Sequence, residues 1–267
     1  MGQQKNRVSL LVFSFYLLVE MNNIESFLCR HASVRQYLDK PVDDDILDRI
    51  IECGGRASNT GNMQVYSVVV TRDAELRRRL CEQHFGQGST APVMLTICAD
   101  VHRYHLWCRQ RGCDEPYGNF LWFLSGVIDA SLFAQNLCVA AESEGLGFCH
   151  LGTVLYNTRA IADILELPKG VVPVIALSLG WPAQQPALSE RLPVEGIAHS
   201  EKYHAYTPDD IDRIHRLREE FPFNQEMVRQ NGTRNLAEIF TRIRYPRESN
   251  ESISRALKDF LTQAGME

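Results

Sequence analysis

Short, β-rich apolar runs separated by stretches of helical periodicity are the main pattern along the chain. The apolar runs at 65–71, 93–98 and 172–179 are bounded by turn residues and are short enough for strands. Apolar residues recur at helical spacing in 43–53, 74–83 and 158–165, and a short apolar segment lies at 148–151. The pattern predicts an α+β fold with a mainly antiparallel sheet and helices on both faces.

The stretch 119–144 is apolar around most of a helical circumference. Before Glu142 its one charged residue is Asp129. A helix without a polar face must be buried on nearly all sides, and in a chain of this size a second subunit provides such burial most easily. The sequence therefore predicts a homodimer.

The pattern changes after Ala183 to a polar, proline-containing loop followed by short helices. These helices are predicted at 209–220, 236–243 and 252–263. Each has few apolar residues, so we expect a C-terminal helical arm that packs over a neighbouring surface. The polar segment 102–118 is expected to be a loop that could form a lid.

The first twenty residues stand apart from the rest of the chain. Residues 8–19 (VSLLVFSFYLLV) imitate a signal peptide, but no A-x-A-like cleavage site follows them. They are also shorter than the roughly 20 residues that span a bilayer. Residues 1–20 are accordingly interpreted as an N-terminal extension that is an upstream reading-frame extension, a docked helix or a cleaved leader.

Composition and charge exclude some classes of partner. With 45% apolar and 23% charged residues, the chain can bury a full core. Its net charge of -5 gives no general attraction to phosphates, so no nucleic-acid partner and no membrane partner are expected. The eight cysteines include no C-x-x-C pair, which argues against zinc and favours a reduced, cytoplasmic protein.

Three polar or glycine-containing clusters lie between the predicted elements. The segment 31–35 (HASVR) offers cationic and hydroxyl groups suited to a phosphate and a ribityl chain. The segment 57–64 (ASNTGNMQ) can hydrogen-bond a flat heterocycle, and the glycines of 144–153 (EGLGFCHLGT) let backbone amides approach a ligand closely. Taken alone, each cluster is also explained by ordinary structure: a surface arginine after an N-cap serine, a turn and a helix C-cap.

Together and in order, these motifs resemble the nitroreductase superfamily, in particular its oxygen-insensitive NADPH nitroreductase and flavin reductase branch. The resemblance runs from about Met21 to the C-terminus, so residues 21–267 are expected to form one nitroreductase-like domain. It rests on RHASVRQY, RASNTGNMQ, ASLFAQNLCVAAESEGLG, CHLG, LGWPAQQPALSERLP with the later His199 and Tyr203, and PRES.

The resemblance implies an FMN held in a groove of the dimer interface, with each site built from both subunits. The chemistry would then reside on the flavin nitrogen N5, with no protein nucleophile and no metal. The first matching motif, for the phosphate and the ribityl chain, consists of His31, Ala32, Ser33, Val34 and Arg35. Asn59 matches the loop on the pyrimidine side, Gln87 matches a glutamine of the family, and Arg191 matches a second phosphate-binding arginine. The segment that would lie along the flavin consists of His150, Leu151, Gly152 and Thr153.

The chain departs from the branch pattern at two positions. Where the branch usually has a lysine in K-P-R-L-P, this chain has Ser189, which removes one charge-assisted phosphate contact. Asn250 stands where the branch often has arginine. Arg229, Arg234 and Arg247 match the region around the NADPH phosphate and the substrate mouth, with Ser249 beside them; solvated surface charges are the alternative interpretation.

These observations predict an FMN-dependent enzyme that oxidises NADPH or NADH and reduces a small-molecule acceptor by two-electron steps. Nitroaromatics, quinones and free flavin are the expected acceptors. Two alternatives stay open: a specialised relative such as a reductive dehalogenase or an enoate-type reductase, and a non-catalytic flavin-binding dimer. The departures at Ser189 and Asn250 favour the second of these.

Overall fold

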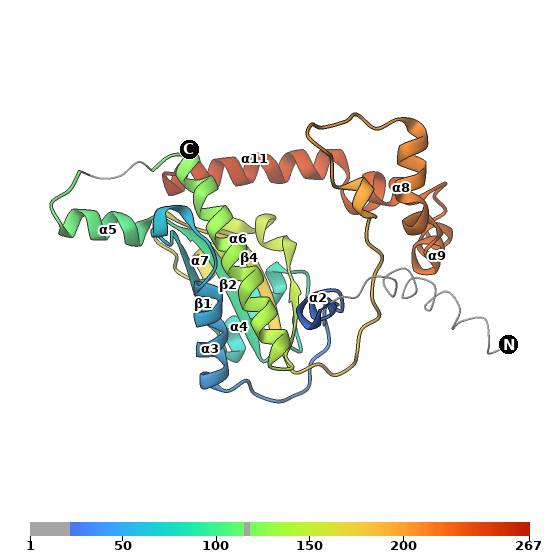
Figure 1. Cartoon of the computed structure of the whole chain (residues 1–267). Coiled ribbons are helices and arrows are strands. Elements are labelled where there is room, and N and C mark those ends of the chain that lie inside the picture. Colours follow the sequence, from blue (N-terminus) through green and yellow to red (C-terminus); the bar gives the residue numbers. More distant parts are fainter. Residues whose placement is uncertain (1–21, 115–117) are drawn as a thin grey trace. The chain divides into compact units, whose positions relative to one another are not determined.

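The computed structural model of the chain describes residues 22–114 and 118–267 (Figure 1). The interpretation of residues 1–20 as an extension therefore lies outside the described residues. The chain divides after Ala32 into a short N-terminal unit and a main unit of residues 33–267. The short unit contains helix α2 (Asn23–Leu28), which begins with a capping box between Asn22 and Glu25.

A four-stranded antiparallel sheet lies at the centre of the main unit. Its strands are β1 (Tyr66–Thr71), β2 (Val93–Asp100), β3 (Gly147–His150) and β4 (Val171–Gly180), in the spatial order β1-β2-β4-β3. Every residue of β2 is buried, and so is every residue of β4 except Ile175. Central strands covered on both faces need such continuous apolar runs, and the predicted α+β class with an antiparallel sheet is confirmed.

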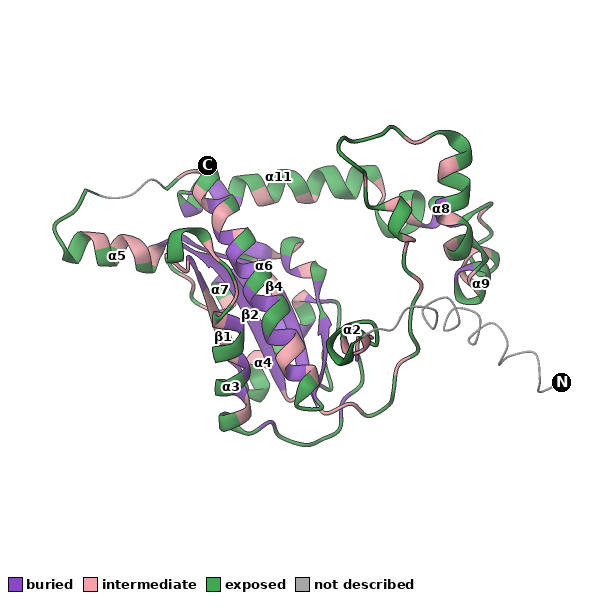
Figure 2. Ribbon diagram, in the orientation of Figure 1, coloured by how far each residue is buried: buried purple, intermediate pink, exposed green. Residues whose placement is uncertain are grey.

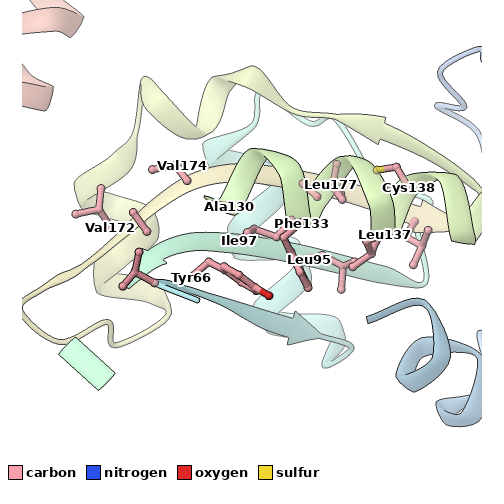
Figure 3. Close-up of a cluster of buried hydrophobic side chains, with 14 of the residues drawn as sticks. Tyr66, Leu95, Ile97, Ala130, Phe133, Leu137, Cys138, Val172, Val174 and Leu177 are labelled. Carbon is pink, nitrogen blue, oxygen red and sulfur yellow. The ribbon is translucent and has the colours of Figure 1, made fainter. Parts of the chain in front are cut away.

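Helix α6 (Phe120–Ser143) packs on one face of the sheet (Figures 1 and 3), and α3 (Asp44–Gly55) packs beside α6 in the same layer. Phe133 of α6 packs against Tyr66 of β1, with ring centroids 4.6 Å apart. The two helices approach closely at Gly54, where an added Cβ would lie 2.8 Å from the Phe133 ring. This layer forms the larger hydrophobic cluster of the protein.

The other face of the sheet is covered by α4 (Ala74–Gln83) and α7 (Thr158–Ile164). Their contact with the strands forms a smaller apolar cluster that includes Leu80, Met94, Ile161 and Ala176. The buried residues follow the two helix layers and the strands between them (Figure 2). The prediction of helices on both faces is thus confirmed.

One face of α6 remains apolar and exposed in the single chain. Leu121, Leu124, Ile128 and Leu132 lie on it at helical spacing, and the first and third are 70% and 58% exposed. The expectation that this helix is buried on nearly all sides therefore does not hold within one chain. Within the described residues, α6 is the one helix that meets the length and composition of a membrane span; its other face packs on the sheet, as in a core helix.

The C-terminal part contains α8 (Pro208–Glu220), α9 (Pro222–Gln230), α10 (Leu236–Glu238), the π-helix η4 (Ile239–Arg244) and α11 (Arg247–Ala264). The C-terminal arm was expected to pack over a neighbouring surface. The end of α11 does more than this, because Phe260, Leu261 and Ala264 are part of the chain's own hydrophobic core. The backbone also closes on this core, with the amide of Gly170 donating to the carbonyl of Ala264 at 3.0 Å.

Three expectations about elements were wrong. Residues 102–110, expected as part of a loop, form helix α5 (His102–Gln110), which begins with the Arg103 amide bonded to the Asp100 carboxylate at 3.1 Å. Helix α9 was not expected, because it fully buries no apolar side chain and so shows only a weak hydrophobic stripe. The helix expected at 236–243 is divided into α10 and η4, since the hydrogen-bond pattern widens at Ile239.

Candidate functional site

An extended segment of residues 33–38 lies along the free edge of the sheet. The Val34 amide donates to the carbonyl of Phe148 in β3 at 2.8 Å, and the Leu38 amide donates to the carbonyl of Trp181 at 2.9 Å. The segment that carries the predicted phosphate motif is therefore held by backbone hydrogen bonds on both sides of Arg35.

A glycine in β3 makes this close approach possible. A Cβ added at Gly147 would lie 2.4 Å from a methyl carbon of Val34, so a larger residue would push the segment off the strand. Arg35, the next residue, is exposed, and its guanidinium lies beside the Cys149 thiol. Burial raises the pKa of this thiol, and Arg35 lowers it by a smaller amount, so Cys149 remains a protonated core residue.

The phenol of Tyr37 joins the segment to the centre of the sheet. Its hydroxyl lies 2.6 Å from the carbonyl oxygen of Val34, 2.9 Å from that of Ser178 and 2.8 Å from Ser178 Oγ. The Tyr37 amide donates to Thr90 Oγ1 at 3.2 Å. Burial raises the pKa of Tyr37, so the hydroxyl stays protonated and works as a structural link.

The loop after α4 lies against the same part of the sheet. Gly86 and Gly88 have φ values of +79° and +83°, which glycine adopts without strain. A Cβ added at Gly88 would lie 3.1 Å from Ser178 Cβ and 3.7 Å from a methyl carbon of Leu151. Gln87, between the two glycines, is exposed. The loop thus presents Gln87 beside the residues that follow β3.

Those residues leave the sheet in a tight turn. The Leu151 amide donates to the carbonyl of Ala176 in β4 at 2.8 Å, and the chain then enters the 3-10 helix η2 (Gly152–Leu155). Thr153 Oγ1 lies 2.8 Å from Nδ1 of His84, the C-cap residue of α4. This histidine was missed by sequence reasoning, because a single histidine at a helix end carries no signal of a partner far along the chain.

The structure brings several predicted cofactor residues to this edge of the sheet. They come from three separate segments, and hydrogen bonds or close packing join each segment to the others. His31 and Ala32 belong to the short N-terminal unit, which ends just before this edge segment in sequence. The residues brought together are Ser33, Val34, Arg35, Gln87, His150, Leu151, Gly152 and Thr153.

Asn59 lies at the opposite edge of the sheet. Its loop leads into β1, and β1 and β3 are separated by three strand spacings, about 14 Å. The loop is fixed to α6 there, because the amide and hydroxyl of Thr60 donate to one carboxylate oxygen of Asp129 at 2.9 and 3.1 Å. Within one chain, Asn59 does not join the other predicted cofactor residues.

Ser189 and Arg191 lie on the exposed connection between β4 and α8. The guanidinium of Arg191 donates to Ser189 Oγ at 2.5 Å and to the carbonyl of Glu190 at 3.0 Å. Glu190 in turn accepts a hydrogen bond from Asn224 at 3.0 Å and lies 3.6 Å from Arg218 of α8. A pocket lined by Ser189, Glu190, Arg191, Leu192 and Arg218 results.

The arginines predicted near the nicotinamide cofactor lie on the C-terminal helices. Arg229 and Arg247 each pair with a solvent-accessible carboxylate on the same side of their own helix, as solvated surface charges do, whereas Arg234 pairs with the buried Glu238. Ser249 is exposed near the start of α11. In the part of the chain that the structure describes, these arginines form their ion pairs on the C-terminal segment and not at the edge of the sheet at β3. The pairs are Arg229 with Glu226, Arg234 with Glu238 and Arg247 with Glu251.

Comparisons with known proteins agree with this fold and with these motifs. The Nitroreductase family matches residues 29–181. An oxygen-insensitive NADPH nitroreductase of Salmonella typhimurium is 35% identical over 178 residues, which are 66% of this chain and 72% of the relative. A protein of Bacteroides fragilis whose crystal structure is known is 41% identical in sequence, and its structure matches this one with a TM-score of 0.89. The match covers 90% of this chain and 99% of the Bacteroides fragilis chain.

A third structure is that of the NADPH:FMN oxidoreductase of Vibrio harveyi in complex with NAD+. Its sequence is 27% identical to this chain, and the TM-score is 0.70. The match covers 82% of this chain and 95% of the Vibrio harveyi chain. The fold and the matched motifs define an α+β oxidoreductase of the nitroreductase type. The chain belongs to the nitroreductase family, as the sequence motifs predicted.

Proposed function

We propose that this chain is an FMN-dependent NAD(P)H oxidoreductase that binds its flavin at the β3 edge of the sheet. The observation that carries the proposal is that three family motifs, far apart in sequence, meet there through Val34, Tyr37 and Gly88. The relatives support the same conclusion, since one is named an NADPH nitroreductase and another an NADPH:FMN oxidoreductase.

The residues at this edge fit an FMN. Arg35 offers an exposed guanidinium for a phosphate, Gln87 an exposed amide, and the residues of 150–153 a turn with free space beside Gly152, where an added Cβ would meet nothing within 4 Å. A bound flavin would accept a hydride from a nicotinamide and pass two electrons to a small acceptor. The protein residues bind and orient it and exclude water.

The acceptors that fit this chemistry are nitroaromatics, quinones and free flavin. NADPH is the expected donor, with NADH as the second. Arg229, Arg234 and Arg247 are the cations proposed for the 2′-phosphate. Each already has a carboxylate partner, so a bound phosphate would have to compete with Glu226, Glu238 or Glu251 for its arginine.

A homodimer completes the proposed site. The exposed apolar face of α6, defined by Leu121, Leu124, Ile128 and Leu132, needs a cover, and a second copy supplies one by two-fold symmetry. The same arrangement would bring the Asn59 loop of one subunit to the β3 edge of the other. Light scattering during size-exclusion chromatography is expected to give twice the mass of the chain.

The dimer proposal is tested by a charge placed on this face. Ile128→Glu is expected to give a monomer, because a carboxylate would be buried without a partner. Leu217→Glu is the control, since Leu217 is 54% exposed on α8 and is not part of the apolar face of α6. A dimer that survives Ile128→Glu would contradict the proposed interface.

The alternative, a dimer that holds flavin without turnover, is favoured by one observation. The guanidinium of Arg191 bonds to its own loop at Ser189 and Glu190, and the family's lysine is missing beside it.

The net charge of -5 and the lack of a basic stripe argue against nucleic acid and anionic membranes as partners. A cytoplasmic location is part of the proposal.

An anaerobic absorbance spectrum tests the proposed function. Protein reconstituted with FMN should show a flavin band at roughly 450 nm that NADPH bleaches within the mixing time, since the cofactor supplies the electron chemistry. The colour should return when a quinone or nitroaromatic is added. A bound flavin that neither NADPH nor NADH bleaches would support the non-catalytic alternative, and a failure to bind FMN would overturn the proposal.

A further inference from the structure

Two side-chain hydrogen bonds join the end of α4 to the turn that follows β3. His84 Nδ1 lies 2.8 Å from Thr153 Oγ1, and Asn157 Nδ2 donates to the carbonyl of Gln83 at 2.6 Å. His84 is fully buried. The loop that carries Gln87 and the turn that carries Thr153 are therefore fixed to each other, 69 residues apart in sequence.

The buried position of His84 determines which of its ring nitrogens carries the proton. Burial lowers the pKa of His84 to about 4, so the ring is neutral at neutral pH. Among the described residues, its Nε2 has no hydrogen-bond partner. In proteins, a buried N–H group that lacks an acceptor is rarer than a buried acceptor that lacks a donor, because leaving the N–H group without a hydrogen bond costs more free energy. The proton therefore lies on Nδ1.

This tautomer sets the direction of the hydrogen bond. Nδ1–H donates to Thr153 Oγ1, so the threonine hydroxyl is an acceptor toward His84. Its own proton is then available for a different acceptor. Thr153 is half-buried, and the neighbouring Gly152 faces open space, so an acceptor can approach the hydroxyl from the side where the flavin is proposed.

We propose that His84 is a positioning residue that holds the Thr153 hydroxyl as a hydrogen-bond donor to an acceptor atom of the flavin ring. The inference rests on the proposed FMN site and adds a donor that is set by a residue outside the family motifs. A donor to a ring acceptor favours the reduced, more electron-rich flavin over the oxidised one. Removal of this donor should therefore lower the flavin's midpoint potential as well as its affinity.

Conservative substitutions at both ends of the bond separate this role from a merely structural one. His84→Asn places an amide N–H near the position of Nδ1, whereas His84→Gln places it near Nε2 and loses the bond. Thr153→Ser keeps the hydroxyl, and Thr153→Val removes it at nearly constant size. Asn157→Ala is the matched control, because it breaks the neighbouring bond between the end of α4 and the N-cap of α7.

The measurements are the FMN dissociation constant from fluorescence quenching, the midpoint potential of the bound flavin and the melting temperature of the apoprotein. Thr153→Val and His84→Gln should weaken FMN binding about fivefold, as expected for one neutral hydrogen bond, and lower the potential. Thr153→Ser and His84→Asn should stay within about twofold of the original protein. Asn157→Ala should lower the melting temperature without a change in potential.

Three outcomes would overturn the inference. If Thr153→Val and His84→Gln lower the melting temperature but leave FMN affinity and potential unchanged, the bond is only a link between α4 and η2. The same holds if Asn157→Ala shifts the potential as much as they do. If the unmodified chain binds no FMN at all, the proposed function fails and the inference fails with it, which the first titration shows.

Discussion

The β3 edge and the C-terminal arm, residues 183–247, hold their predicted site residues in different ways. At the edge, Gly147 and Gly88 allow contacts that any larger residue would prevent, and backbone hydrogen bonds fix both sides of Arg35. On the arm, Arg229 and Arg247 are exposed and are held by surface ion pairs, which contribute little to stability. Substitutions should therefore act strongly on the edge and weakly on the arm.

The largest effect is expected for Gly147→Ala. The added Cβ would lie 2.4 Å from Val34, so the segment that carries Arg35 must move off β3. We expect a loss of about 3 kcal/mol in the free energy of unfolding, by analogy with overpacked cores, and loss of FMN binding. Urea denaturation and FMN titration measure both quantities. Gly55→Ala is the control, because its Cβ would meet its nearest atom at 3.8 Å; equal effects in both variants would contradict the steric account.

The next effect concerns pH. The pKa of His84 is about 4 in the folded protein and about 6.5 in an unfolded chain. Below pH 6.5 the unfolded chain takes up a proton that the folded protein resists, so stability is fully present above pH 6.5 and falls toward pH 4. The contribution lost between pH 7 and pH 5 is about 2 kcal/mol. Urea denaturation of the original protein and of His84→Asn should differ by this pH-dependent amount; parallel curves would show that His84 is not buried as described.

A smaller effect is expected for Tyr37→Phe. The substitution removes the hydroxyl that lies between the Val34 carbonyl and Ser178, while the ring continues to fill its buried site. We expect a loss of about 1.5 kcal/mol in unfolding free energy, with FMN affinity reduced in proportion to the loosening of the segment. Thermal denaturation with and without FMN checks this. An unchanged stability would mean that backbone bonds alone hold the segment.

The smallest effect on the fold is expected for Arg229→Ala. Its pair with Glu226 is exposed, so the unfolding midpoint should not change measurably. If Arg229 binds the 2′-phosphate, the KM for NADPH should rise severalfold and that for NADH should stay the same. Steady-state kinetics with both donors test this. Equal changes for the two donors would exclude a role in phosphate recognition.

The sequence predicted the regular core well, because its signals are local. The β-rich runs and the helical spacing of 74–83 matched strands β1, β2 and β4 and helix α4 within two residues at each end. Helices α5 and α9 were missed, because neither fully buries an apolar side chain and so neither carries a clear hydrophobic stripe. The family motifs selected residues that the structure places at the β3 edge, and their role toward a cofactor stays a prediction.

Long-range geometry could not be predicted in the same way. The bond between His84 and Thr153 depends on packing of α4 against η2, which no local pattern contains. The separation of Asn59 from the other predicted cofactor residues follows from the strand order β1-β2-β4-β3, which puts its loop and β3 at opposite edges. Both facts concern how the elements are arranged, whereas the sequence motifs concern which residue types are present.

The central claim is that the β3 edge binds FMN through Arg35, and the selectivity for FMN over riboflavin tests it most directly. The two ligands differ in the phosphate, so the original protein should bind FMN more tightly. Arg35→Ala should weaken FMN binding about tenfold or more and leave riboflavin binding unchanged, while the exposed control Arg79→Ala changes neither. If Arg35→Ala weakens both ligands equally, or neither, the phosphate is bound elsewhere and the account is contradicted.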